Sequence, residues 1–478
     1  MDPSAADPLA LAFIGLEWTI RIAMLVVVPF RRSPDAARGW LLIVFFLPVP
    51  ALVLYLLIGR PTYPRWRRRR IAEAKRLLAH STGQISHSQH CCRPALPESL
   101  APAAMLIEHL GQFPALGGNR VNLLADYDGV IDRLIADIDR ADDHVHLLTY
   151  IFAADATGGR VIEALLRAAT RGVACRVLID ALGSRPWAGE IRRRLAAGGV
   201  EIARALPVSL LRRRSARADL RNHRKIAVID AEVGYIGSQN IIAADFVPGV
   251  VNHELMVRVT GPAVLEFQAV FVTDWLLETG QVLAEPALFP HRHGQAGVVA
   301  QLLPSGPDYP VAAVGRLVVA LIHGAHRRIV ITTPYFIPDE SLLQALQTAV
   351  LRGIEVHLVL SQAADHPLVN LAQRSYYDEL LSAGVAIHVF RGGLLHAKHL
   401  SIDDAISVIG SSNIDIRSFL LNAEASLILY DADVTAALQA EQTRNLAASD
   451  RVMADEWAQR TLWAKIAENI ARLISPLL

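Results

Sequence analysis

The stretch at 222–240, NHRKIAVIDAEVGYIGSQN, decides the fold class because its pattern returns at 395–413 as LHAKHLSIDDAISVIGSSN. In each copy a His-x-Lys pair precedes an apolar run, and a Gly-Ser turn then leads to Asn. A strand kept only for packing would retain its apolar residues and let its polar ones drift. The repeat therefore indicates an internal duplication with a chemical purpose. The paired residues, each 173 positions apart, are His223, Lys225, Asp230, Gly237, Ser238 and Asn240 with His396, Lys398, Asp403, Gly410, Ser411 and Asn413.

The surroundings of the two motifs alternate strand-like and helix-like segments. The first half reads strand, helix, strand over 144–155, 160–172 and 173–180, and the second half does so over 327–339, 341–353 and 354–361. Parallel strands joined by crossover helices imply an α/β fold. We therefore predict two homologous lobes related by a pseudo-twofold axis, each a layered sheet with helices on both faces.

The domain organisation expected from these patterns has five parts. They are a membrane-embedded helical hairpin (1–60), a basic juxtamembrane segment and linker (61–117), lobe 1 (118–285), lobe 2 (286–440) and a C-terminal helical segment (441–478). Apolar residues at helical spacing in the last part predict packing against a lobe, with an interfacial helix as the alternative.

Membrane attachment is indicated by composition. Mean hydropathy is +0.31, and residues 9–30 and 40–58 are each near the length that spans a bilayer. Glu17 and Arg21 lie inside the first segment, where their spacing allows an ion pair, and Pro48 and Pro50 kink the second. Two spanning helices and a re-entrant or interfacial hairpin both remain open.

Basic residues after the second segment, including Arg67, Arg68, Arg69 and Arg70, predict a cytoplasmic catalytic body in contact with anionic lipid. The link between the segments also carries arginines, which favours shallow insertion. A further patch, expected to contact anionic headgroups, comprises Arg212, Arg213, Arg214 and Arg217.

The charge balance argues against nucleic acid as a partner, because 47 Lys and Arg face 46 Asp and Glu. Three cysteines are too few for a disulfide framework and fit a reducing compartment. His87, His90, Cys91 and Cys92 have poor metal-ligand spacing. We expect neither a metal nor another cofactor.

The paired motifs predict one shared site. If His223 and Lys225 lie in a strand they point to the same face, as do His396 and Lys398. Together with Ser238, Asn240, Ser411 and Asn413 they form a donor-rich pocket suited to a phosphate. One imidazole can attack phosphorus while the other protonates the leaving alkoxide and later activates the incoming hydroxyl.

Supporting carboxylates are also expected. A nucleophilic imidazole needs an acceptor on its other nitrogen, and Glu254 and Glu424 are the candidates. Asp230 and Asp403, although part of the catalytic motif, are expected to hold its loop rather than touch substrate.

The pattern His-x-Lys-x4-Asp followed by Gly-Ser-x-Asn, present twice, resembles the phospholipase D superfamily. Further stretches, among them DWLLETG (274–280), TPYFIPDESLL (333–343) and ISPLL (474–478), resemble bacterial cardiolipin synthases of that type. The resemblance covers nearly the whole chain, with no departure at the twelve paired positions.

The resemblance implies transfer of a phosphatidyl group between two phosphatidylglycerol molecules at the bacterial inner membrane, giving cardiolipin and glycerol. It also implies that His223 is the nucleophile and His396 the acid and base. A phospholipase D-type hydrolase using water, or a non-catalytic membrane scaffold, are the alternatives.

Overall fold

The computed structural model describes residues 8–32, 34–57, 59, 65–208, 219–283, 285–290, 296–309, 312–363 and 367–474. The chain divides into two units, a small one built mainly on the N-terminal residues up to Arg65 and a large one that begins at Trp66. The predicted patch of Arg212, Arg213, Arg214 and Arg217 lies outside the described residues.

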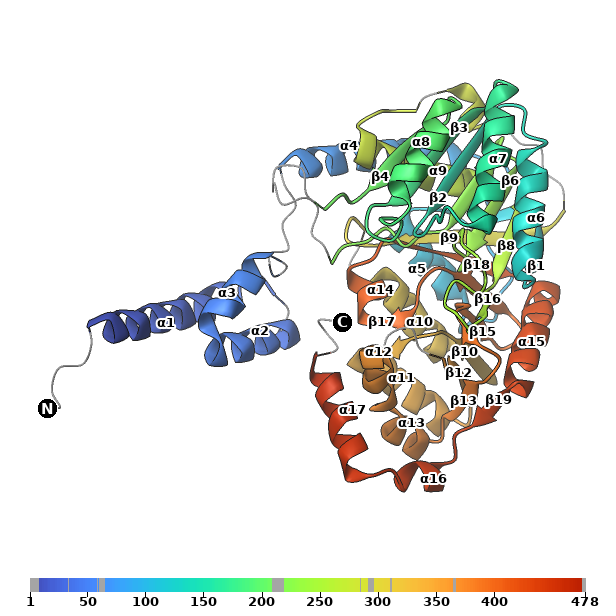
Figure 1. The fold of residues 1–478 in the computed structure, drawn as a ribbon. Coiled ribbons are helices and arrows are strands. Elements are labelled where there is room, and N and C mark those ends of the chain that lie inside the picture. Colours follow the sequence, from blue (N-terminus) through green and yellow to red (C-terminus); the bar gives the residue numbers. More distant parts are fainter. Residues whose placement is uncertain are drawn as a thin grey trace, which may run out of the picture. The chain divides into compact units, whose positions relative to one another are not determined.

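The small unit consists of helices α1 (Pro8–Val27), α2 (Pro34–Phe46) and α3 (Pro48–Leu57), shown in blue in Figure 1. Within the described part of the chain, only α1 is long and apolar enough to cross a membrane. The second apolar segment was expected to be kinked by Pro48 and Pro50, and it forms two shorter helices. It divides at Leu47, because Pro48 has no N–H to continue the helical hydrogen bonds.

Side chains inside the small unit agree with the sequence pattern. Arg21 pairs with Glu17 at 3.2 Å, as their spacing predicted, and also donates to the Phe45 carbonyl at 3.1 Å. Trp40 and Tyr55 pack edge to face with ring centroids 5.2 Å apart. The polar contact joins α1 to α2, and the aromatic contact joins α2 to α3.

The large unit is built on one sheet whose strand order reads alike from both ends. The order, among the described residues, is β19-β13-β12-β10-β15-β16-β18-β9-β1-β8-β6-β5-β2-β3-β4. Antiparallel pairing of β1 with β9 forms the centre. The seven strands of lobe 1 lie on one side of it, and the seven strands of lobe 2, followed by β19, lie on the other. The lobe 1 strands are β1 (Leu116–Leu124), β2 (His144–Thr149), β3 (Ala174–Asp180), β4 (Glu201–Ala205), β5 (Ile226–Ile229), β6 (Val233–Gly237) and β8 (Met256–Thr260). The lobe 2 strands are β9 (Val298–Ser305), β10 (Arg328–Thr332), β12 (Glu355–Ser361), β13 (Ala386–Phe390), β15 (His399–Ile402), β16 (Ile406–Gly410) and β18 (Glu424–Tyr430), with β19 (Ser449–Arg451) added at the edge.

The predicted strand, helix, strand units are confirmed in both lobes. Parallel β2 and β3 are connected by α7 (Ala156–Thr170), and parallel β10 and β12 by α11 (Glu340–Leu351). Only the outer strands of each lobe are parallel, since β5, β6 and β8 pair antiparallel, as do β15, β16 and β18. The sheet is therefore mixed, with helices on both faces as expected.

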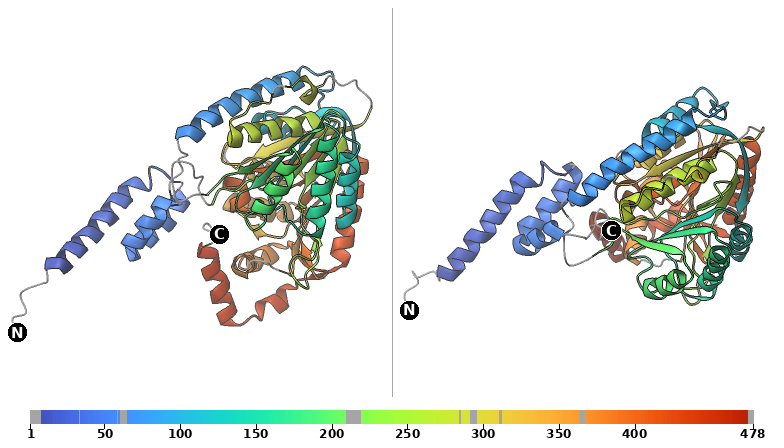
Figure 2. Two further views of the ribbon diagram at one scale, coloured as in Figure 1. Left: turned by 45° about the horizontal axis from the view of Figure 1, so that its top comes forward. Right: turned by 90° about the horizontal axis from the view of Figure 1, so that it is seen from above.

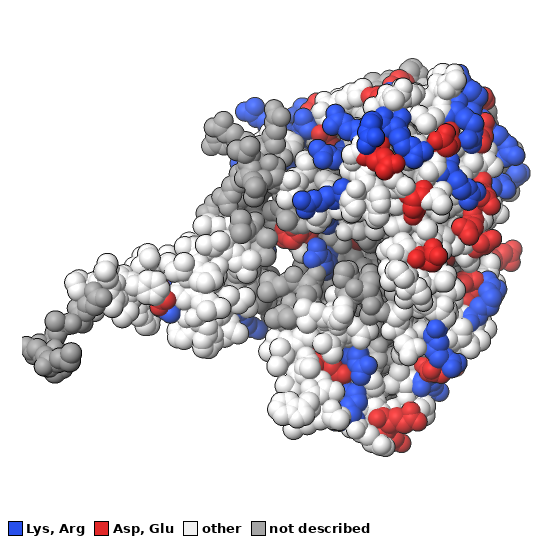
Figure 3. Space-filling view, viewed as in Figure 1, with Lys and Arg blue, Asp and Glu red and all other residues white. Residues whose placement is uncertain are grey.

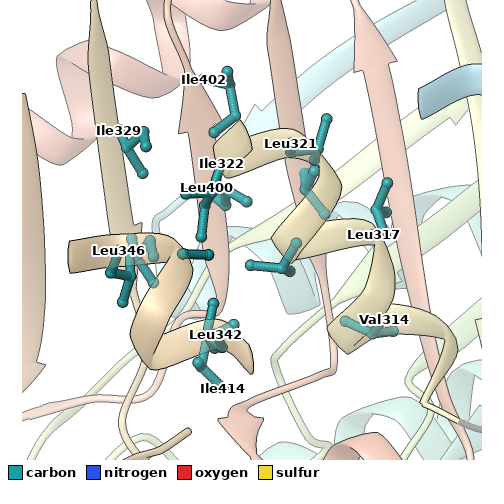
Figure 4. Packing of buried hydrophobic residues seen from close by; sticks show 14 of the residues in the cluster. Val314, Leu317, Leu321, Ile322, Ile329, Leu342, Leu346, Leu400, Ile402 and Ile414 are labelled. Atoms are coloured by element: carbon teal, nitrogen blue, oxygen red, sulfur yellow. The ribbon is translucent and has the colours of Figure 1, made fainter. Parts of the chain in front are cut away.

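Helices cover the sheet through apolar faces. In lobe 2, α10 (Ala313–Gly324) and α11 pack Leu317, Leu321 and Leu346 against Ile329 and Ile402 of the sheet, as Figure 4 shows. The other helices on the sheet are α5 (Ala101–Gly111), α6 (Tyr127–Ile138), α8 (Ala188–Ala197), α9 (Val264–Thr279), α13 (Tyr377–Ala383) and α15 (Ala432–Ala447).

Helix α4 (Arg65–Ser86) uses part of the arginine run for folding. Both views of Figure 2 place it beside α9. Arg67 is buried and pairs with Glu278 at 2.9 Å, and Arg70 donates to the carbonyls of Leu277 and Glu278 at the end of α9. A cation at a helix C-terminus is favourable because the last carbonyls carry partial negative charge. The expected lipid contact therefore falls to the exposed Arg68 and Arg69.

The C-terminal segment contains α16 (Ala454–Ala458) and α17 (Leu462–Ile474), and α17 packs on α12 (Pro367–Arg374). The expected lobe boundary at residue 440 falls inside α15, and β19 still pairs with β13 of lobe 2. We propose that lobe 2 ends after β19.

Candidate active site

Each motif histidine is fastened to the opposite lobe. The two-residue strand β14 (Leu394–Leu395) pairs in parallel with β7 (Asn252–His253), and the His396 N–H donates to the His253 carbonyl at 2.8 Å. In the same way Asn222 bridges Ala423, and the His223 N–H donates to the Ala423 carbonyl at 2.8 Å. The histidines and lysines precede β15 and β5 rather than lying inside them, which corrects the strand placement expected from the sequence.

Because of these pairings, the glutamate of each lobe contacts the histidine of the other lobe. His223 Nδ1 of lobe 1 lies 3.1 Å from Glu424 Oε1 and 3.2 Å from its Oε2, whereas His396 Nδ1 of lobe 2 lies 2.6 Å from Glu254 Oε1. The expected glutamates thus contact the histidines, each from the other lobe. Such a contact on Nδ1 leaves Nε2 of each ring for chemistry.

Burial sets the protonation of the two histidines. It lowers the pKa of His223 to about 4, with the charge of Glu424 opposing that lowering. Burial also lowers the pKa of His396, again against the opposing charge of Glu254. Burial acts to raise the pKa of Glu254, but contact with His396 outweighs it and holds the pKa at about 2. Glu424 behaves alike, because His223 holds its pKa below the usual range. Both carboxylates are therefore anionic.

The motif lysines lie beneath the histidines. Lys225 Nζ donates to the His223 carbonyl at 2.7 Å, and Lys398 Nζ contacts the His396 carbonyl in the same way. Burial lowers the pKa of Lys225 to about 7, and the neighbouring Glu424 partly restores it. Lys225 Nζ also lies 5.5 Å from the ring centroid of Tyr150, whose ring contacts His223. The charges of Lys225 and Lys398 both act to lower the pKa of each histidine.

A pocket of about 680 Å³ opens over these groups. It brings together the predicted residues His223, His396, Asn240, Asn413 and Glu254, and Glu424 is fully buried behind His223. Tyr150, Tyr335 and Arg417 line the same pocket.

The two motif serines are placed differently from the expectation. Ser238 accepts from the Leu255 N–H at 3.0 Å, and Ser411 accepts from the Ala425 N–H at 3.0 Å. Both are fully buried, neither lines the pocket, and each hydroxyl lowers the pKa of the glutamate beside it. The serines therefore bond the backbone next to Glu254 and Glu424, and the expected contact with phosphate is not favoured by this geometry.

The motif aspartates close turns away from the pocket, as expected. Asp230 accepts the backbone N–H groups of Asp142, Asp143 and His144 at 2.8–2.9 Å. Asp403 accepts those of His326, Arg327 and Arg328 at 2.8–3.0 Å. Both have positive φ angles, 51° and 50°, which a short polar side chain tolerates. They hold the sheet rather than the substrate.

Sequence reasoning missed a second asparagine pair. Asn252 and Asn422 line the pocket, two residues before Glu254 and Glu424. The signal was available, because Asn-x-Glu is repeated in both lobes. The amide oxygens of Asn252, Asn413 and Asn422 are buried and have no hydrogen-bond partner among the described residues. A buried polar group needs a partner, so these amides suit a hydroxyl-rich ligand.

A buried arginine at the lobe seam was also missed. Arg224, the variable residue of the first motif, pairs with Asp274 at 2.5 Å and donates to the carbonyls of Glu424 and Ser305 at 3.0 Å. It joins α9 of lobe 1 to the strand that carries Glu424. No single sequence pattern links Arg224 to Asp274, because their contact depends on how the lobes meet.

No group of three or more His, Cys, Asp or Glu residues in the described ranges is arranged to hold a metal ion. Cys91, near the histidines at 87 and 90, has a pKa raised to about 11 by burial, so it carries no thiolate.

Comparison with known proteins decides the family. The family described as cardiolipin synthase, PLD-like domain, matches residues 134–275 and 318–445, which contain both motifs. The chain belongs to this cardiolipin synthase family. It is 33% identical to cardiolipin synthase A of Klebsiella pneumoniae over 98% of both chains. It is 34% identical to cardiolipin synthase A of Salmonella arizonae over 96% of this chain and 95% of that one.

Two further similarities extend the family assignment. Residues 20–60, which include α2 and α3, match the family described as phospholipase D-nuclease N-terminal. The crystal structure of phosphatidylserine synthase from Haemophilus influenzae superposes with a TM-score of 0.62 at 14% identity, covering 80% of this chain and all of that one. The two-lobed fold of this cardiolipin synthase family member is therefore shared with that enzyme.

Proposed function

We propose that the protein is a cardiolipin synthase that transfers a phosphatidyl group from one phosphatidylglycerol to another and releases glycerol. The observation that carries the proposal is the pair of crossed His–Glu contacts at one pocket. Two imidazoles with orienting carboxylates supply a nucleophile and an acid for one phosphodiester.

In the first half-reaction, His223 Nε2 attacks phosphorus and the bond to the glycerol oxygen breaks. The proton on His396 Nε2 passes to that oxygen, so glycerol leaves neutral and a phosphatidyl group remains on His223. In the second half-reaction, His396 Nε2 takes the proton from a hydroxyl of the second phosphatidylglycerol. That oxygen attacks phosphorus, the bond to His223 breaks, and cardiolipin forms.

The difference between the two contacts supports this division of roles. His223 has a pKa of about 4 and a contact of 3.1 Å, which favour the neutral ring that attacks. His396 has a shorter contact of 2.6 Å, and a short charge-assisted hydrogen bond stabilises the protonated ring that donates.

The remaining pocket residues suit the substrate. The amides of Asn240 and Asn413 supply donors to the phosphate, and the charges of Lys225 and Lys398 act on the neighbouring His223. Asn252 and Asn422 offer amide groups to glycerol hydroxyls. Arg221 and Arg417, which also line the pocket, face the anionic headgroup of the acceptor.

We also propose that the protein resides in the bacterial inner membrane with its catalytic body on the cytoplasmic side. The apolar α1 and the basic start of α4 support this orientation.

Incubation of the purified full-length protein in vesicles with phosphatidylglycerol, followed by mass analysis, tests the function. We expect cardiolipin and free glycerol in equal amounts. Phosphatidic acid as the main product would replace the proposal with hydrolysis. An unchanged rate in both His223→Ala and His396→Ala would remove the mechanism, and no product from the wild type would leave the scaffold alternative.

A further inference from the structure

Helix α17 turns its apolar side outward. The exposed fractions of Leu462, Trp463, Ile466, Ile470 and Leu473 lie between 38% and 79%. At about 100° per residue these five side chains fall within a stripe of ~100°. The expected packing against a lobe is therefore found for Trp457 of α16 but not for these five residues, which leaves the interfacial alternative.

The inner side of α17 is held by a buried carboxylate. Glu468 is 1% exposed and pairs with Arg374 of α12 at 2.9 Å and with Arg460 at 3.1 Å. Arg460 in turn pairs with Asp378 of α13 at 2.9 Å. Glu468 lies roughly opposite the stripe on the helix, so the ion pairs fix the apolar side outward. Breaking a buried pair leaves an uncompensated charge, which disfavours rotation of the helix.

Charge on the outward side suits an anionic surface. Glu468 is the only acidic residue of α17. Lys465 lies beside the stripe, whereas Arg472 pairs with Glu379 of α13 at 3.4 Å. In Figure 3 the edge of the molecule over α17 is largely uncharged. An apolar stripe with a cation beside it and no outward carboxylate on the helix is typical of a helix that lies in a membrane interface.

One helix connects α17 with the pocket. α12 packs directly on α17, and its Leu368 lines the active-site pocket while 39% exposed. Phe246 of lobe 1 also lines the pocket and is 40% exposed. Helix α12 thus connects α17 with the mouth of the pocket.

We propose that α17 docks on the surface of an anionic bilayer and holds the pocket against it. This attachment is additional to that of the N-terminal helices. Trp463 enters the acyl boundary, and the cation Lys465 lies at the level of the phosphates.

Quenching of tryptophan fluorescence by brominated phosphatidylcholine tests the docking without any catalytic step. Wild-type protein and Trp463→Phe, both full length, are reconstituted in vesicles of phosphatidylglycerol and phosphatidylcholine brominated at shallow or deep acyl positions. We expect a quenched component, strongest with shallow bromine, that is lost in Trp463→Phe. Equal quenching of both proteins overturns the proposal. If Leu473→Glu also lowers the mass of the protein in detergent, the stripe is instead covered by a second copy.

An activity comparison, which rests on the proposed function, adds a matched control. Leu473→Glu alters the stripe, whereas Leu351→Glu makes the same change at an 85% exposed leucine at the end of α11. We expect Leu473→Glu to lose roughly 10-fold or more of its rate on vesicles with dilute phosphatidylglycerol, because a charge weakens interfacial binding. On dispersed short-chain phosphatidylglycerol it should equal the wild type, and Leu351→Glu should equal it on both.

Equal rates for the two variants on vesicles, or an equal loss on dispersed substrate, overturn the docking. Absence of cardiolipin from the wild type would instead remove the proposed function and leave the quenching result to judge α17.

Discussion

The two half-sites share their motif residues yet differ in what surrounds them. In lobe 1 the motif begins Arg221, Asn222, and its variable residue is Arg224, whereas the corresponding residues of lobe 2 are Leu394, Leu395 and Ala397. The first half is thus bound into a polar network with Asp180 and Asp274, and the second is packed among apolar groups. The motif residues are thus the same in both halves, whereas the residues that surround them differ.

The two histidines also differ in their contacts with glutamate. His223 has the longer glutamate contact and His396 the shorter one, although each carboxylate is fully or nearly fully buried. Two rings of the same sequence context can therefore take different roles, one as nucleophile and one as acid. Paired variants, one in each half, test whether the two half-sites differ in role.

The largest effect is expected from the histidines. Each of His223→Ala and His396→Ala should lose at least roughly 10³-fold of kcat with phosphatidylglycerol. A phosphatidyl ester of p-nitrophenol needs little leaving-group protonation, so release of p-nitrophenol should recover in His396→Ala and stay absent in His223→Ala. Recovery in His223→Ala alone would reverse the two roles.

The next effect concerns the arginine that only lobe 1 possesses. Arg224→Met leaves Asp274 buried without its partner and should lower the free energy of unfolding by about 3–5 kcal/mol. The double variant Arg224→Met with Asp274→Leu should recover much of that loss. Denaturant unfolding in detergent measures both. A double variant as unstable as the single one would show that the pair does more than neutralise charge.

The crossed glutamates should affect the pH profile in opposite limbs. Each of Glu424→Gln and Glu254→Gln should lower kcat about 10²-fold. Glu424 opposes the burial that lowers the pKa of His223, so Glu424→Gln lowers that pKa further and keeps the nucleophile neutral to lower pH. The acid limb of kcat/KM should move to lower pH.

Glu254→Gln should instead lower the pKa of His396, whose protonated ring is then lost at lower pH, so the alkaline limb moves down. Profiles of kcat/KM between pH 4 and 9, roughly, separate the two cases. A shift of the same limb in both variants would contradict the division of roles.

The smallest effect is expected from the motif aspartates, which make the same kind of backbone contacts in both halves. Asp230→Asn and Asp403→Asn keep a side chain that tolerates positive φ but replace one of two acceptor oxygens with a donor. Each should lower the free energy of unfolding by about 1–3 kcal/mol, because a backbone N–H loses its acceptor. Activity per folded molecule should stay within a factor of about two, which thermal unfolding and specific activity together measure. A loss of activity without a loss of stability would return the aspartates to the reaction.

Local patterns were sufficient to predict much of the fold and of the site. Strand-helix-strand periodicity gave the crossover units around α7 and α11, since it depends only on neighbours along the chain. The fixed 173-residue spacing of the motifs predicted that both histidines share a site, and the pocket contains both. The glutamates could be named because each follows its motif and precedes an apolar strand.

Long-range pairing decided what the sequence left open. Which glutamate contacts which histidine depends on β14 pairing with β7 and on Asn222 bridging Ala423, contacts between segments more than 140 residues apart. The serines turned inward because Leu255 and Ala425 lie beside them in the folded sheet.

The sequence alone determined the paired motifs, the duplicated α/β lobes and an apolar N-terminal helix, because these follow from residue type and short-range spacing. Tertiary structure alone decided which glutamate contacts which histidine, the pairing of Arg224 with Asp274, and the outward direction of the α17 stripe. Helical spacing defines an apolar side but not the direction in which it faces. For α17 that direction is set by the ion pairs of Glu468 with arginines outside the helix.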